Sequence, residues 1–169
     1  MLDTWSKEYD KDFNELINKY KEYTTEVLNI EREQKKPRKD YETYGTILNS
    51  IWYMFDELFV GDLSYDFKNV TEKQEISNIL KTYMDKYFDD SDDKDTWFNK
   101  IKLLCDELGY ASDMKAYKEN PENFKGNITD VTTVIRVALT TSSMTPDLYE
   151  LLKLIGNERT SKRFEKFYI

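Results

Sequence analysis

The 169-residue chain has no histidine, a single cysteine, three prolines and five glycines. With no histidine and one cysteine, a zinc site and a histidine-based catalytic triad are both excluded. The lone Cys105 also excludes an internal disulfide framework, and its place in a helical apolar pattern favours a small core residue. No apolar run approaches the roughly 18 residues of a membrane span, and no export signal is present. The sequence therefore predicts a soluble, cytoplasmic protein that does not bind a membrane.

The charge balance limits how the chain can bind nucleic acid. It has 33 acidic and 25 basic residues, for a net charge of −8. Such a balance argues against a protein that coats nucleic acid without specificity, but it allows recognition of a few bases by a local basic surface. Aromatic residues make up 15% of the chain. Most of the tyrosines fall at helical spacing, which favours core margins over base stacking.

Helical periodicity dominates the first part of the chain. Residues 2–34 place their apolar side chains on one helical stripe, until Pro37 ends the pattern inside the basic run 35–39. Asp40 is placed to cap a second helix with apolar positions from Tyr44 to Phe59. A connector follows, so we expect an all-α protein of two small helical bundles, with domains at 1–65 and 66–169.

The second part of the chain also has the pattern of helices. Thr71 to Gln74 is a capping-box sequence that predicts a helix through Phe88. The acidic run 89–95 lacks the glycine and glutamate that a calcium loop needs at its sixth and twelfth positions, so a solvated loop is predicted. A further helix is expected from Thr96 to Leu108, ending at Gly109.

Residues 131–141 give conflicting signals. Their β-branched side chains favour a strand by propensity, whereas their apolar positions repeat at helical spacing behind Asp130, a good N-cap. Periodicity is the better guide, so a helix is predicted. Arg136 then lies about 130° from the centre of the apolar stripe and is expected to point toward solvent or a ligand.

The next segment reads as a helix start. Thr145 can serve as N-cap, Pro146 fits the first helical position, and Asp147 complements the positive end of the helix dipole. The apolar positions that follow, beginning with Leu148, indicate a helix that stops at Gly156. A polar turn of this kind offers backbone N–H groups to an anionic or planar ligand, such as splayed RNA bases.

These residues carry a resemblance to a known family. Residues 101–169 resemble the C-terminal anticodon-binding domain of bacterial glutamyl-tRNA synthetase, and the run from Pro37 to Asp40 with the helix ending at Phe55 is similar to the preceding helical domain. The matching elements are Glu107-Leu108-Gly109, Lys125-Gly126, Ile135 to Thr140, Thr145 to Leu148, and Gly156 to Arg159. The helical cage of a class I lysyl-tRNA synthetase is the near alternative. A helical protein–protein interaction module is the alternative from another class, suggested by the negative charge and the tyrosines.

The resemblance implies two all-α subdomains that form a helix cage around the anticodon loop of the tRNA for glutamate. In the full-length enzyme, a class I ligase, a Rossmann-type catalytic domain attaches glutamate with ATP and Mg²⁺. Neither a HIGH-type nor a KMSKS-type signature occurs here. The resemblance thus implies a chain that needs its catalytic domain in cis, is inactive alone, holds no cofactor or metal, and acts as a cytoplasmic monomer that does not bind DNA.

The resemblance also assigns roles to individual residues. Arg38 matches the arginine that reads the third anticodon letter, and Arg136 the arginine at the first. Thr145, Pro146 and Leu148 match the turn that holds the middle uridine, although Leu148 alone would be read as core. Thr141 stands where the family usually has glycine. By charge alone, the candidate phosphate contacts are Lys35, Lys36, Lys39, Lys162, Arg163 and Lys166.

Overall fold

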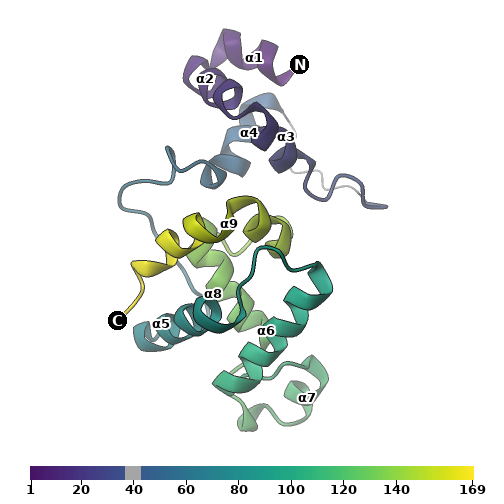
Figure 1. Ribbon diagram of the computed structural model, residues 1–169, viewed down its shortest axis with the longest axis vertical. Helices are drawn as coiled ribbons and strands as arrows, with labels where there is room; N and C mark the ends of the chain where they lie inside the picture. The colour runs from purple at the N-terminus through teal and green to yellow at the C-terminus, as the bar shows by residue number, and fades with distance from the viewer. Residues whose placement is uncertain (37–42) are drawn as a thin grey trace. The chain divides into compact units, whose positions relative to one another are not determined.

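The chain forms two compact units, Met1–Leu63 and Ser64–Ile169 (Figure 1). The computed structural model describes residues 1–36 and 43–169. Over those residues the regular structure is helical, and the one β-type contact is an isolated bridge between Ala111 and Asn127. The all-α class predicted from periodicity is confirmed.

Three short helices, and not one long one, make up the first segment of the first unit. They are α1 (Leu2–Tyr9), α2 (Lys11–Lys19) and α3 (Lys21–Asn29). The predicted single stripe is wrong because the backbone leaves the helical region at Asp10 (φ −150°) and again at Tyr20 (φ −118°). The Asp10 carboxylate accepts the N–H of Phe13 and so starts α2 as its N-cap.

The first unit closes its core against α4 (Tyr44–Ile51) and a 3₁₀ turn, Trp52–Met54. Thr43 caps α4 in a capping box, whereas the predicted cap, Asp40, lies outside the described residues. The Tyr23 hydroxyl donates to Met54 O at 2.9 Å and ties α3 to the end of the turn. The buried apolar side chains are Phe13, Ile17, Val27, Ile30, Ile47, Ile51, Tyr53, Met54 and Phe55.

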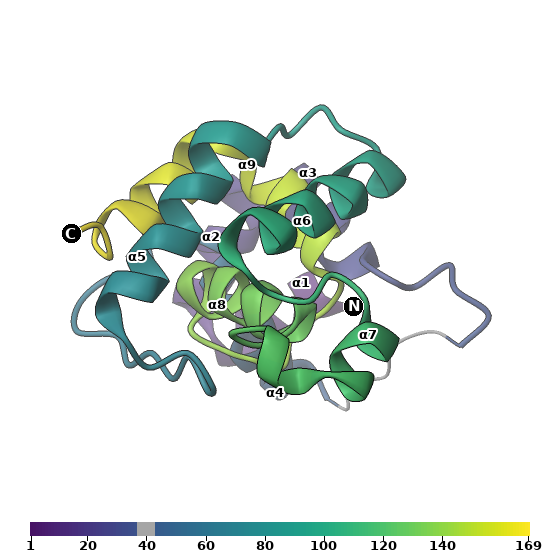
Figure 2. The same ribbon diagram turned by 90° about the horizontal axis from the view of Figure 1, so that it is seen from below.

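Helix α8 (Ile128–Thr140) is the centre of the second unit. It contacts α5 (Lys73–Thr82), α6 (Lys94–Leu108) and α9 (Leu148–Glu165), as Figures 1 and 2 show. A π-helical turn, Tyr83–Tyr87, extends α5. The short α7 (Met114–Glu119) and a 3₁₀ turn, Pro121–Asn123, complete the unit at the end away from α9 (Figure 1).

Burial explains why residues 131–141 become helix despite their strand propensity. Val131, Val134 and Ile135 are fully buried on one face of α8, against the three neighbouring helices. The predicted cap at Asp130 is wrong. Asn127 caps α8 by accepting the N–H of Thr129, and the Asp130 carboxylate accepts the N–H of Asn127 in return.

The starts of α5 and α6 differ from the prediction, whereas the end of α6 agrees with it. Helix α5 begins after Glu72 without a side-chain cap, so the capping box expected at Thr71 does not form. Helix α6 begins two residues early because Asp93 accepts the N–H of Thr96 at 2.8 Å. It ends at Gly109, whose φ of +82° is the left-handed conformation that glycine adopts without strain. Cys105, on the buried face of α6, is fully buried, and burial raises its pKa to about 12.

Helix α9 is interrupted where a stop was predicted. At Gly156 the backbone leaves the helical region (φ 77°, ψ 174°), and a second helical half begins at Asn157. The Asn157 N–H donates to Asp90 Oδ2 at 3.2 Å, so the run 89–95, which we name the acidic loop, caps this half. In the same loop, Asp92 pairs with Lys100 at 2.6 Å. The loop is solvated as predicted, since all of its residues except the half-buried Asp92 are exposed, and it also makes these structural contacts.

Candidate nucleic-acid interface

The turn between α8 and α9 brings three of the predicted site residues together. The Arg136 guanidinium donates from Nη1 to Pro146 O at 2.6 Å and also to the Thr145 hydroxyl. Arg136 is half-buried, so its side chain lies along the turn and does not extend straight into solvent. Residues expected to act on separate bases therefore form one hydrogen-bonded group.

The start of α9 corrects the predicted roles of this segment. Asp147, and not Thr145, is the N-cap, and its Oδ1 accepts the N–H of Glu150 at 3.2 Å. The Thr145 hydroxyl donates to Pro146 O at 3.0 Å, so it belongs to the turn. Leu148 is only 3% exposed and packs as a core residue. Of the three residues assigned to the middle uridine, Thr145 and Pro146 therefore keep accessible positions.

The turn itself is held by a hydroxyl relay that the sequence analysis missed. The buried Thr140 donates from Oγ1 to Arg136 O at 2.8 Å and accepts the N–H of Ser142 at 3.2 Å. Ser142 Oγ in turn donates to Met144 O at 2.9 Å. Thr141 takes a φ of +70°, a left-handed conformation that is unusual for a β-branched residue. The resemblance predicts glycine at this position, and glycine adopts the left-handed conformation without strain. The expected glycine was therefore the one feature of the sequence that could have indicated this conformation.

Two lysines of the second unit contact residues at the start of α9. Lys94 Nζ lies 2.7 Å from Asp147 Oδ2, although the two residues are 53 positions apart. Lys153 Nζ lies 3.1 Å from the Tyr149 hydroxyl, a contact that raises the pKa of the lysine. Both lysines are exposed. Sequence reasoning could not place Lys94 here because its position depends on the packing of α6 against the start of α9.

The predicted phosphate contacts occupy different settings. Lys35 and Lys36 are exposed at the end of the segment that follows α3. Lys162 is exposed on α9, and its Nζ lies 3.9 Å from Glu158. Arg38 and Lys39 lie outside the described residues.

Two predicted cations near the C-terminus are committed to contacts within the second unit. Arg163 is 5% exposed and donates from Nη1 to Leu139 O at 2.7 Å, so little of its side chain is accessible to a phosphate. Lys166 contacts the Tyr65 hydroxyl, its Nζ lies 4.2 Å from the Tyr65 ring centroid, and burial lowers its pKa. The sequence could not distinguish the buried Arg163 from the exposed Lys166, because the two cations occur at helical spacing.

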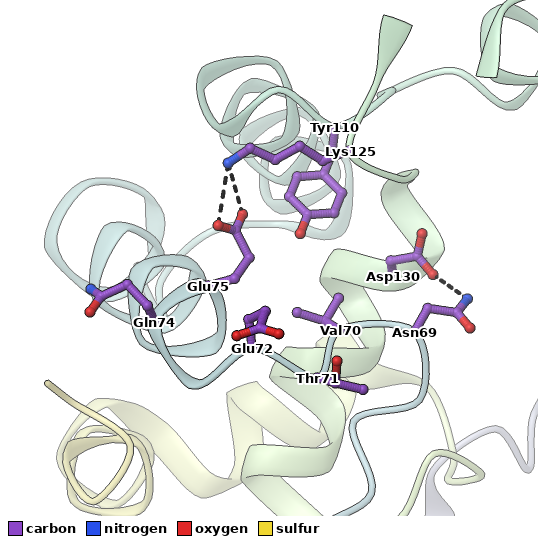
Figure 3. Close-up of a pocket in the computed structure, with 9 residues that line it drawn as sticks. All are labelled: Asn69, Val70, Thr71, Glu72, Gln74, Glu75, Tyr110, Lys125 and Asp130. Atoms are coloured by element: carbon purple, nitrogen blue, oxygen red, sulfur yellow. Dashed lines mark hydrogen bonds and ion pairs between the residues drawn. The ribbon is translucent and has the colours of Figure 1, made fainter. Parts of the chain in front are cut away.

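A cavity of about 410 Å³ lies at the opposite end of α8 from this turn (Figure 3). Three of its four charged side chains have partners: Lys125 Nζ lies 3.0 Å from Glu75 Oε1, and Asn69 donates to Asp130 at 2.7 Å. The fourth, Glu72, is exposed. Burial raises the pKa of Tyr110, whose ring forms part of the wall. The lining residues are Asn69, Val70, Thr71, Glu72, Gln74, Glu75, Tyr110, Lys125 and Asp130.

The described part of the chain has neither a metal-binding cluster nor a membrane-spanning helix. Within residues 1–36 and 43–169, no cluster of His, Cys, Asp or Glu has the arrangement to hold a metal ion. Over the same ranges, no helix has both the length and the apolar character to cross a membrane.

Comparisons with known proteins place the chain in a family. The model of the anticodon binding domain matches residues 15–168. Glutamate–tRNA ligases are similar: that of Clostridium perfringens (strain SM101) is 41% identical over 165 residues, that of Acetivibrio thermocellus 40% over 162, and that of Sorangium cellulosum 33% over 163. Each match covers 96% of this chain but only 30%, 29% and 28% of the respective relative. No solved structure matches. The all-α chain, with its hydrogen-bonded turn between α8 and α9, belongs to the anticodon-binding domain family.

Proposed function

We propose that this chain reads the anticodon of the tRNA for glutamate as the C-terminal region of a glutamate–tRNA ligase. The observation that carries the proposal is the family match over residues 15–168, joined by similarity to such ligases over 96% of the chain. The polar turn gathered around Arg136 supports it, because single-stranded RNA is recognised through unstacked bases that meet polar groups and apolar surfaces.

The middle letter is assigned to the Thr145–Pro146 turn. Its carbonyl oxygens already accept N–H groups, since Arg136 Nη1 lies 3.4 Å from Thr145 O and 2.6 Å from Pro146 O. Uracil presents one N–H donor on its pairing edge, which suits such acceptors. In this proposal the Arg136 side chain holds the turn that binds the middle letter and also contacts the first letter. One side chain therefore takes part in the recognition of both bases.

The third letter is assigned to Arg38. A guanidinium only donates hydrogen bonds, so its two-pronged face matches the adjacent N3 and O2 acceptors of cytosine. The corresponding edge of guanine presents donors at N1 and N2 and is disfavoured. Glutamate anticodons end in C and glutamine anticodons end in G, so one arginine would separate the two tRNAs.

The rest of the proposal concerns the full-length ligase. We assign residues 1–65 and 66–169 to two anticodon-binding subdomains of a cytoplasmic, monomeric enzyme that does not bind DNA. We assign ATP and Mg²⁺ to its catalytic domain. This chain contributes binding and discrimination, and by itself it should not attach glutamate to tRNA.

The alternatives make different predictions. A class I lysyl cage is not favoured, because the relatives named above are glutamate–tRNA ligases, and it should prefer anticodons with U at the third letter. A protein–protein interaction module would bind through apolar surface and respond little to salt. Anticodon binding should instead weaken as salt rises, because phosphate contacts release counterions.

The test is the affinity of the 169-residue chain for two anticodon stem-loops that differ only in C or G at the third letter. We expect a preference for C of about 5- to 150-fold, the usual effect of one good base contact. Arg38→Gln should reduce that preference to near unity. Arg32→Gln, which removes the same charge from the exposed segment after α3, is the matched control and should keep it.

Three outcomes would contradict the proposal in different ways. Failure to bind either loop at low salt would remove the anticodon assignment for this chain. Equal binding of both loops by the wild type would keep that assignment and remove the role of Arg38. Loss of the preference in Arg32→Gln as well would show an effect of net charge.

A further inference from the structure

Met144 is an exposed apolar side chain on a backbone that is held in place. It is 84% exposed, the highest value among the large hydrophobic residues of Ser64–Ile169. Single apolar side chains on a surface are common and need no explanation by themselves. Here, however, the Met144 N–H donates to Ser142 Oγ at 3.1 Å, and the same hydroxyl donates to Met144 O at 2.9 Å. One serine thus fixes both backbone groups of Met144.

The residues before Met144 extend this support back into α8. Thr140 Oγ1, with its residue fully buried, accepts the N–H of Ser142, and Thr141 holds the left-handed conformation between them. A non-glycine residue in that conformation is strained, and it persists where the surrounding structure enforces it. Two hydroxyl groups and a strained residue therefore hold the backbone from which the Met144 side chain extends.

Met144 also directly precedes the polar groups assigned to the middle letter. The next residue, Thr145, has its hydroxyl bound by Arg136 and its carbonyl 3.4 Å from the same guanidinium. A nucleobase has polar edges and apolar faces, and a protein that reads the edge of an unstacked base also has to cover a face. The turn thus offers polar acceptors and an apolar side chain next to one another.

We propose that Met144 is a further base-contacting residue, whose side chain packs against the face of the nucleobase held at the Thr145–Pro146 turn. This inference rests on the proposed function and names one more residue of the same site. Methionine suits the role because it is unbranched and its polarisable sulfur makes favourable contacts with aromatic rings. The contact is apolar, so it adds affinity without adding a phosphate contact.

The experiment measures the affinity of the 169-residue chain for a glutamate anticodon stem-loop over a range of salt concentrations. Met144→Ala should weaken binding about fivefold, from the loss of buried apolar area, and Met144→Leu should stay within about twofold of wild type. The slope of log affinity against log salt should not change, because it counts phosphate contacts. Met114→Ala is the matched control: Met114 is an exposed methionine on α7, and its variant should bind as wild type.

The outcomes separate this inference from the function on which it rests. If wild type binds the stem-loop and Met144→Ala binds equally well, the proposal for Met144 is overturned while anticodon binding stands. A loss in Met144→Ala that comes with a changed salt slope, or that Met114→Ala shares, overturns it as well. If wild type binds no stem-loop at low salt, both proposals fail. Equal melting temperatures of the variants would confirm that the loss arises in binding.

Discussion

Arg136 Nη1 lies 2.6 Å from the carbonyl oxygen of Pro146, ten residues further along the chain. This bond, together with the contact to the Thr145 hydroxyl, connects the last part of α8 to the start of α9. The groups proposed to read the first two anticodon letters are therefore mechanically coupled. A base that moves Arg136 also moves the acceptors that meet the next base.

Replacing Arg136 should affect both stability and binding. Arg136→Met removes charge-assisted hydrogen bonds to the turn, so we expect the free energy of unfolding to fall by about 1–3 kcal/mol. Lys162→Met, at an exposed position on α9, should change it by less than about 0.5 kcal/mol. In a double-mutant cycle with Thr145→Val, stem-loop affinities should be non-additive. Additive effects would mean that the two residues act independently.

Thr141 is a position where glycine should stabilise the chain. Its φ of +70° strains a β-branched side chain, and glycine adopts this conformation freely. After the larger backbone entropy of glycine in the unfolded chain is included, Thr141→Gly should raise the free energy of unfolding by about 1 kcal/mol. Thr133→Gly, in the middle of α8, should instead lower it, by about 0.3 kcal/mol from helix propensity alone. Urea unfolding measures both, and a loss in Thr141→Gly would rule out strain at this residue.

Gly126 should not tolerate even a methyl group. A Cβ placed there would lie 2.5 Å from Asp130 Oδ2 and 3.1 Å from the Tyr110 ring. Asp130 cannot easily yield, because it holds the start of α8 through the N–H of Asn127. We expect Gly126→Ala to cost about 1–3 kcal/mol, whereas Gly45→Ala should be neutral or slightly stabilising, since its nearest neighbour is 3.6 Å away. Equal melting temperatures for the two variants would contradict this account.

Glu57 gives the first unit a pH dependence. A hydrogen bond from Lys19, and to a smaller extent one from Tyr20, lowers the pKa of Glu57 from 4.5 to about 2. Because the folded-state pKa is depressed, this stabilisation is present above pH 4.5 and is lost as the pH falls toward 2. The difference in melting temperature between wild type and Glu57→Gln should shrink over that window. Lys19→Met, which removes the main donor, should show the same trend; a difference that stays constant down to pH 2 would exclude the mechanism.

The sequence predicted helices where apolar periodicity was supported by burial, and it failed where single side chains set the boundaries. Residues 131–141 became helix because their buried face is common to three neighbouring helices, which outweighs β-branched propensity. The breaks at Asp10 and Tyr20 were missed because the apolar stripe continues across both. The observed N-caps are Asn127 and Asp147, and not the predicted residues, because several side chains near each helix start could accept the same N–H groups.

The candidate site was predictable in its residue types and not in its connections. The resemblance named Arg136, Thr145 and Pro146, and the structure shows that they bond to one another. No local pattern indicates that Lys94 reaches Asp147, because that contact depends on how α6 packs beside the start of α9. The burial of Arg163 also depends on how the helices pack, so its position within a helix did not predict that burial.

The acidic loop has a consequence for how the length of this chain can vary. Surface loops rich in aspartate usually accept insertions and deletions readily. This one caps Asn157 through Asp90, accepts the Tyr149 hydroxyl at the carbonyl of Asp92, and contains Lys94, the partner of Asp147. Adding or removing one residue would put these contacts out of register with α9. Family members in which α9 is interrupted at the position of Gly156 should therefore have the same number of residues in this loop, even where the residue types differ.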